Sequence, residues 1–214
     1  MKDLFQNPVY KFLSLVVDLV GVNLLFLLCC VPVITIGPAL VALFTISLRL
    51  VRNTCDTPVR SFLTIFRENL RQGIVLTLLV AVIGGFLLFI TLWAYQISSI
   101  QEGFVYTLFF VFCAIVLGLF LAALMYLFAL QAQFSNTLIN TVLNAFRLAV
   151  KHLHKTLCLM IIPAGILWIS SLTAETFAVV TMVLLAFGFV LIAYLQAQIL
   201  VPIFDIYIKQ AEEQ

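Results

Sequence analysis

Long apolar blocks alternate with short polar segments along this chain. The blocks lie near residues 12–31, 33–50, 74–97, 104–130, 157–172 and 177–204. Because a helix of about 20 apolar residues crosses the hydrocarbon of a bilayer, the blocks predict an all-α membrane protein with six transmembrane helices. The second block is short and contains the breakers Gly37 and Pro38, so a shallow re-entrant hairpin is the alternative for residues 33–50.

Two of the polar segments have a helical pattern of their own. Between Asn53 and Gly73 the apolar stripe consists of Val59, Phe62, Leu63, Phe66 and Leu70. Between Asn136 and Thr156 it consists of Leu138, Val142, Ala145, Phe146, Ala149 and Leu153. Apolar residues at this period, with polar residues opposite, predict two amphipathic helices, each running into the next membrane span. Thr57 and Pro58 predict the start of the first helix, as N-cap and first helical residue.

The polar faces of these two helices form a candidate interaction surface. Its residues are Arg60, Arg67, Arg71, Asn136, Asn140, Asn144, Arg147, Lys151 and Lys155. Arginine and lysine attract anionic lipid head groups by about 1 kcal/mol each near a membrane surface. The asparagines add uncharged hydrogen-bonding groups that suit a protein partner. The surface therefore predicts contact with lipid, with a partner protein, or with both.

The two helices also match each other in sequence, which predicts a weak internal repeat. A constant offset of 80 residues relates Leu63, Phe66, Arg67 and Arg71 to Leu143, Phe146, Arg147 and Lys151. Convergence is the alternative, because any two interfacial helices need aromatic and basic residues.

Composition and charge set the environment and the orientation. The chain is 64% hydrophobic, has a mean hydropathy of +1.23 and is only 9% charged, so lipid must cover its surface, and a basic nucleic-acid-binding face is excluded. With six spans, all eleven basic residues lie on one side, while Glu102 and Glu175 lie on the other. The positive-inside rule then places both termini and both amphipathic helices in the cytoplasm.

A few polar residues fall within or at the ends of the apolar blocks. Asp18 is an intramembrane carboxylate, and we expect it to pair with Arg67 or Arg147; proton or substrate handling is the alternative. Asn23 lies deeper and is expected to hydrogen-bond between helices. The glutamines at the block ends mark the membrane interface or, alternatively, line a polar vestibule for a sugar. These are Gln131, Gln133, Gln196 and Gln198.

No catalytic or metal-binding pattern is present in the sequence. His152 and His154 point apart on a helix, and the five cysteines lack a metal-ligand spacing. There is no glycine-rich phosphate loop of the kind that ATPases carry. We therefore expect no enzyme activity and no cofactor.

The stretch NLLFLLCCVPVITIGPA, from Asn23 to Ala39, resembles the N-terminal signature of the YesL-like family of small bacterial membrane proteins. Its most specific part is the pair Pro32 and Pro38 with the Ile-Gly-Pro sequence. Further similarity lies in residues 42–52, 61–69, 134–138 and 147–156.

The resemblance implies a function near carbohydrate import. Members are typical of Gram-positive bacteria and are often encoded beside binding-protein-dependent sugar importers. The implied role is a non-catalytic accessory or assembly subunit that contacts the permease of a carbohydrate ABC importer. The alternatives are a stand-alone small transporter or channel, and a homo-oligomeric scaffold in which Gly84 and Gly85 face another copy.

Overall fold

The computed structural model describes residues 8–55, 57–100, 103–134 and 137–212, and within them it is helical without strands. The helices are α1 Pro8–Cys30, η2 Val33–Thr35, α2 Ile36–Val51, α3 Pro58–Glu68, α4 Leu70–Ile100, α5 Phe104–Gln133, α6 Leu138–Lys151, α7 Leu153–Ser170, α8 Ala174–Val183, the π-helical segment η3 Leu184–Gly188, and α9 Phe189–Glu212. This confirms the all-α prediction.

Several helices have the length and composition of membrane spans. Five such segments occur in the described residues: Val33–Val51, Leu70–Ile100, Phe104–Gln133, Leu153–Ser170 and Ala174–Ile208. A shorter apolar segment, Val16–Cys30, lies in α1. The chain is therefore a multi-pass membrane protein.

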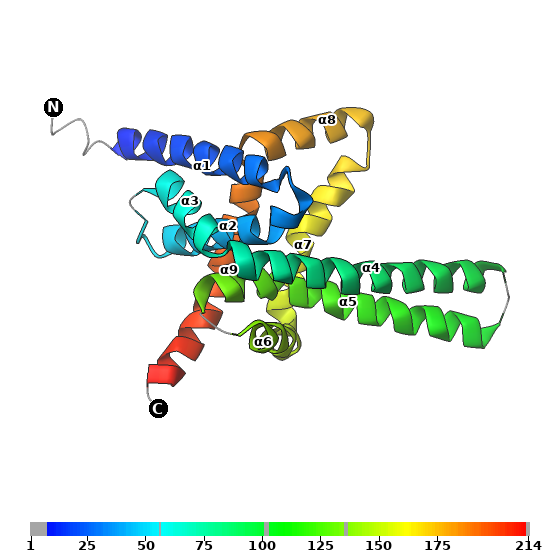
Figure 1. The fold of residues 1–214 in the computed structure, drawn as a ribbon. Helices are drawn as coiled ribbons and strands as arrows, with labels where there is room; N and C mark the ends of the chain where they lie inside the picture. Colours follow the sequence, from blue (N-terminus) through cyan, green and yellow to red (C-terminus); the bar gives the residue numbers. More distant parts are fainter. Residues whose placement is uncertain (1–7, 56, 101–102, 135–136, 213–214) are drawn as a thin grey trace.

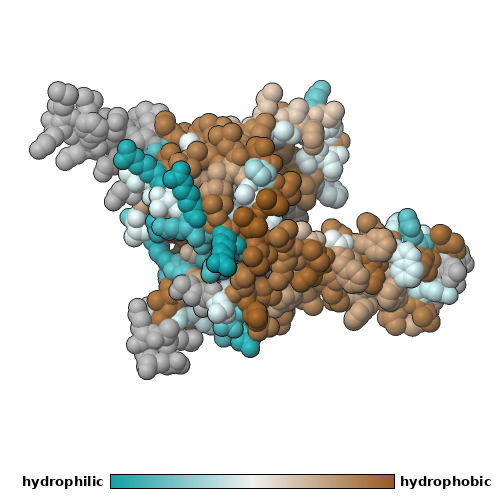
Figure 2. Space-filling view, in the orientation of Figure 1, coloured by the Kyte–Doolittle hydropathy of each residue, from teal (hydrophilic) through white to brown (hydrophobic). Residues whose placement is uncertain are grey.

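The longest feature is a hairpin of α4 and α5, which projects beyond the rest of the molecule (Figure 1). Contacts along it join Gly84 to Phe120, and the Tyr95 ring to the Phe110 ring at 5.5 Å between centroids. Figure 2 shows hydrophilic colours gathered over α3 and α6 and around the base of the hairpin. Hydrophobic colours cover its length, and polar colours return at its tip and near the α7–α8 connection.

By contrast, α2 forms the centre of the core. It contacts α1, α3, α4, α5 and α9. In the candidate span Val33–Val51, which contains α2, 61% of the apolar stretch is buried, against 11–22% in the other candidate spans. Where α2 meets α4, the backbones touch: the Gly37 amide donates to Thr77 Oγ1 at 2.9 Å, and a Cβ on Gly73 would lie 2.6 Å from the Pro38 nitrogen. Only glycine allows this approach at either position.

The last apolar block is one segment in sequence but bends in space. The sequence predicts a continuous span over residues 177–204, whereas α8 ends at Val183 and the π-helical turn leads into α9. Figure 1 shows the two helices meeting at a sharp bend. A π turn leaves backbone carbonyls without their usual α-helical donors, so it needs support from elsewhere in the fold.

Both amphipathic segments contain a helix with shorter bounds than predicted. The α3 helix begins at Pro58 as expected, but Thr57 makes no side-chain capping bond. It ends at Glu68, and α4 starts at Leu70. The α6 helix ends at Lys151, because His152 leaves helical geometry with φ −117° and ψ 47° before α7 begins.

Candidate functional site

The α6 helix has three distinct faces. Thr141, Ala145, Leu148 and Ala149 are buried against the bundle. The polar face carries Asn140, Asn144, Arg147 and Lys151 on successive turns. The third face is apolar yet exposed, and it consists of Ile139, Leu143, Phe146 and Val150. In water this face would be unfavourable, so it indicates contact with lipid or with another protein.

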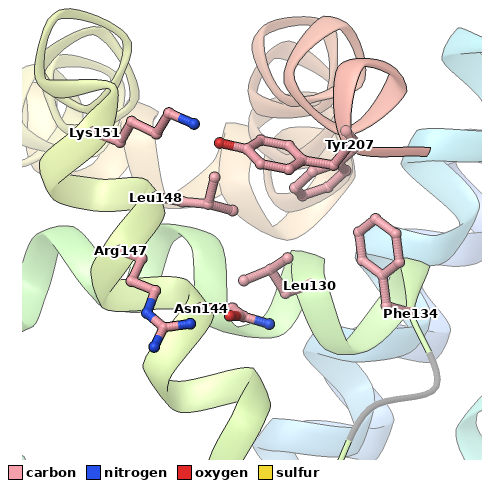
Figure 3. Close-up of a pocket in the computed structure, with 8 residues that line it drawn as sticks. Leu130, Phe134, Asn144, Arg147, Leu148, Lys151 and Tyr207 are labelled. Atoms are coloured by element: carbon pink, nitrogen blue, oxygen red, sulfur yellow. The ribbon is translucent and has the colours of Figure 1, made fainter. Parts of the chain in front are cut away.

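A groove runs between α6, the end of α5 and the C-terminal part of α9 (Figure 3). Its volume is about 330 Å³, and its lining residues are Leu130, Phe134, Asn144, Arg147, Leu148, Lys151, Phe204 and Tyr207. The Phe134 and Phe204 rings meet edge to face with centroids 5.7 Å apart. The floor is thus apolar, while α6 supplies a polar and basic wall.

Tyr207 lies across the groove from α6 and links α9 to the end of that helix. Lys151 Nζ lies 5.1 Å from the centre of the Tyr207 ring, and the Tyr207 hydroxyl oxygen is 3.5 Å from His152 Nε2. Burial lowers the pKa of His152 below its usual 6.5, and the charges of Lys155, Lys151 and His154 lower it further. The histidine is therefore neutral at pH 7, and the positive charge of the groove comes from Arg147 and Lys151.

A buried hydrogen-bond network holds the joint between α6 and α7. Thr156 Oγ1 lies 3.0 Å from the Tyr126 hydroxyl and donates to the Ala149 carbonyl at 2.9 Å. The Tyr126 and Thr156 side chains are almost fully buried. This fixes the end of α6 to α5 and so sets the shape of the groove wall.

The other predicted surface residues lie outside this groove. Arg60 and Arg67 are exposed on α3, and Arg71 is exposed at the start of α4. Lys155 is on α7, and Asn140 is exposed on α6 but does not line the groove. Asn136 lies outside the described residues.

Asp18 and Asn23 behave differently in the structure. The expected pairing of Asp18 with Arg67 or Arg147 is wrong: no ion pair joins these described residues. Asn23 is fully buried, and its Nδ2 donates to the carbonyls of Leu184 and Leu185 at 3.1 and 2.8 Å. Its Oδ1 also accepts from the Val190 amide at 3.3 Å. Asn23 thus supplies the donors that the π turn lacks.

The sequence pattern did not reveal the ion pair that forms among the described residues. Arg52 donates to Asp205 Oδ1 at 2.7 Å and to Gln133 Oε1 at 2.8 Å, joining the ends of α2, α5 and α9. All three residues lie just beyond the ends of apolar blocks that the positive-inside rule places on the cytoplasmic side. That shared position was the available signal.

The glutamines divide between two environments. Gln131 Nε2 donates to Gln72 Oε1 at 2.6 Å, and with Gln133 it lines a polar pocket of about 350 Å³. Charged and amide groups of Arg49, Glu68, Asn69 and Gln72 share this pocket. Gln196 is instead buried beside the Leu159 carbonyl, and Gln198 is exposed.

These features describe an all-α, multi-pass membrane protein whose groove, polar pocket and ion pair lie around the ends of α2, α5 and α9. Residues 19–90 match the family described as "Protein of unknown function, DUF624", the domain that YesL-like proteins carry. The predicted resemblance is therefore confirmed over this part of the chain, which includes Asn23, the α1–α2 turn and α3. Comparison with curated proteins and with solved structures gave no match.

Proposed function

We propose that the chain is a non-catalytic accessory or assembly subunit of a carbohydrate ABC importer in the bacterial cell membrane. The family resemblance implies this setting. The observation that carries the proposal is the open flank of the α4–α5 hairpin, which offers a helix-packing surface inside the membrane.

Two glycines make this flank suitable for a neighbouring helix. A Cβ added to Gly85 or Gly118 would meet nothing within 4 Å, whereas one on Gly84 would lie 3.0 Å from Phe120. Because Gly84 pairs with Phe120 across the hairpin, Gly85 and Gly118 lie at about the same level of adjacent helices. Small residues on a lipid-facing surface let another helix approach closely, which is the main source of helix association in membranes.

Co-purification in mild detergent tests the proposal. The tagged chain should co-purify with permease subunits of an oligosaccharide importer of its host, and Gly85→Leu with Gly118→Leu should abolish this. Gly165→Leu is the matched control, since this α7 glycine also faces open space. A chain that never associates with a permease would overturn the proposal. Association only between two differently tagged copies would favour the homo-oligomeric scaffold.

The polar pocket beside Gln131 supports a second candidate, a stand-alone transporter or channel. Its Arg49, Glu68, Asn69 and Gln72 groups are the kind that hydrogen-bond a polar solute. Sugar flux into liposomes that contain only this chain would support that function. Absence of flux, with a known permease as positive control, would exclude it.

We further propose that both termini, α3 and α6 face the cytoplasm, as the distribution of basic residues favours. This orientation requires an even number of crossings. Six spans satisfy it, and so do four spans with a re-entrant α1–α2 hairpin. The packing of α2 favours the re-entrant arrangement.

Both ends of α2 pack at one end of the α4–α5 hairpin. Its first turn rests on Gly73 and Thr77 in the first turns of α4, and Arg52, just after its last turn, binds Gln133 at the end of α5. The exposed aromatic Trp93 lies 20 residues beyond Gly73 on α4, a distance of about 30 Å along a helix. Because this equals the hydrocarbon thickness and tryptophan favours the interface, Gly37 and Gly73 lie near the inner edge.

The exposed apolar side chains and the internal hydrogen bonds of the α1–α2 turn suit a turn that lies within lipid. Val31, Val33 and Ile34 are 77%, 72% and 52% exposed. The Thr35 hydroxyl contacts the Cys29 and Pro32 carbonyls at 2.6 and 2.7 Å, so the irregular backbone finds partners without water.

Thiol labelling tests this topology in a chain whose native cysteines are replaced. In the Val33→Cys variant, the thiol should resist a membrane-impermeant maleimide added outside intact cells. Ser99→Cys, at the α4–α5 tip, is the control that should be labelled. Equal labelling of both positions would establish six crossings instead.

A further inference from the structure

We propose that the groove between α6, α5 and α9 is a binding site for one anionic phospholipid of the inner leaflet. Its phosphate would lie on the α6 wall that carries Arg147 and Lys151, and an acyl chain would lie on the apolar floor. The site depends on the proposed orientation of α6. It does not depend on any association with an importer.

The basic wall is set up to hold a phosphate. Asn144, Arg147 and Lys151 lie at i, i+3 and i+7 on α6, and all three line the groove. In Figure 3, Lys151 points toward Tyr207, while Arg147 points the other way, on the side of Asn144. No carboxylate lines the groove, and within the described residues neither Arg147 nor Lys151 forms a salt bridge. The nearby Asp205 already binds Arg52 at 2.7 Å. Two cations and an amide donor are therefore available to an anion.

The floor distinguishes a lipid from a soluble anion. Leu130, Leu148 and Phe204 are 4%, 6% and 0% exposed and lie beneath the floor, while the half-buried rings of Phe134 and Tyr207 supply its accessible apolar surface. A free phosphate would contact only the wall and leave this apolar surface in water, which is unfavourable. A phospholipid covers both surfaces, since its anion and its hydrocarbon are adjacent.

The position of the groove also favours a membrane ligand. The exposed apolar face of α6, with Ile139, Leu143, Phe146 and Val150, adjoins its polar face. Figure 1 shows α6 end-on where α4 and α5 are seen lengthwise, so α6 runs across the hairpin base. A helix that lies across the spans, apolar on one side and basic on the next, has the arrangement of an interfacial helix. The groove is thus at the level of the head groups.

Native mass spectrometry of the purified full chain in detergent provides the test. Phosphatidylglycerol should bind more tightly than phosphatidylcholine with the same acyl chains. The double variant Arg147→Gln, Lys151→Gln should weaken phosphatidylglycerol binding about 30-fold, as expected for two basic contacts near a surface. The control Arg60→Gln, Arg71→Gln removes the same charge elsewhere and should change binding less than threefold.

Several results would overturn the site. Equal losses in the two double variants would mean a general charge effect. Equal binding of the two lipids would mean that the cations do not recognise the phosphate. Displacement of the lipid by millimolar glycerol 3-phosphate would mean a site for a soluble anion.

A second measurement needs no variant. Phosphatidylglycerol with a photoreactive group on its acyl chain should cross-link to the accessible floor residues Phe134 or Tyr207 in the native protein. Cross-links confined to the α4–α5 hairpin would place the lipid elsewhere and reject the site.

Discussion

The helices α3 and α6 look alike in sequence and differ in what covers their apolar faces. In α3, Phe62 is fully buried and Ile65 is 7% exposed, because α1 and α2 pack over them. In α6, a full row of apolar side chains from Ile139 to Val150 remains exposed. One helix is therefore part of the protein core, whereas the other has a free face for lipid or a partner.

The difference can be traced to the chain around each helix. The α1–α2 hairpin precedes α3, and both its helices contact α3. The α6 helix contacts α5 and α7, with no comparable hairpin among the described residues. Two similar amphipathic segments thus acquire different roles because only one has enough neighbouring protein to cover it.

The largest expected difference between the two helices comes from removing one aromatic ring from each, in two separate variants. Phe62→Ala should lower the free energy of unfolding by about 3–5 kcal/mol, because a fully buried ring leaves a cavity and loses its stacking on Phe66. Phe146→Ala, at the position 84 residues later, should cost less than about 1 kcal/mol because that ring is 38% exposed. Unfolding of both variants in one detergent measures the difference. Equal losses would show that α6 is covered as α3 is.

Sequence reasoning found both helices but could not tell them apart. Periodicity locates apolar positions, yet lipid and protein select the same residue types to cover them. It placed Leu63 inside, although Leu63 is 37% exposed and Ile65 is the buried residue. It also missed Ile139 and Val150, whose exposure depends on which side of α6 meets α5.

Long-range polar contacts were equally out of reach of local patterns. Asn23 was expected to bond between helices, and it does, but no local pattern pointed to its partners in the π turn and α9, more than 160 residues away. Nothing in the run from Phe177 to Phe204 marks that turn except Gly188, where a Cβ would lie 3.0 Å from the Val183 carbonyl. The wrong expectation for Asp18 has the same cause, because charge pairs depend on which helix ends meet.

A second test concerns the close contact between α2 and the first turn of α4. Gly73→Ala should destabilise the protein by about 1–3 kcal/mol, since its Cβ would lie 2.6 Å from the Pro38 backbone nitrogen and force the helices apart. Gly85→Ala is the control, because nothing lies within 4 Å of that position. Thermal unfolding in detergent should separate them. A neutral Gly73→Ala would mean that α2 does not pack tightly on α4.

The third test concerns the joint that fixes α6. Thr156→Val should cost about 1–3 kcal/mol, because it leaves the buried Tyr126 hydroxyl without its partner. Thr64→Val on α3 removes an exposed hydroxyl bonded within its own helix and should be nearly neutral. Adding Tyr126→Phe to Thr156→Val should recover part of the loss. No recovery would mean that the two hydroxyls do not interact.

The smallest effect is expected where α6 meets α9. Tyr207→Leu keeps an apolar side chain in the groove but removes the ring that lies 5.1 Å from Lys151 Nζ. At an exposed site such a cation–π contact contributes about 0.5–1 kcal/mol, so unfolding should shift only slightly. In the background of Lys151→Gln the same substitution should have no further effect, because the cation is already gone. A loss that persists in that background would assign the stabilisation to packing of the ring or to its contact with His152 instead. The link between α6 and α9 would then not depend on the charge that is free to bind an anion.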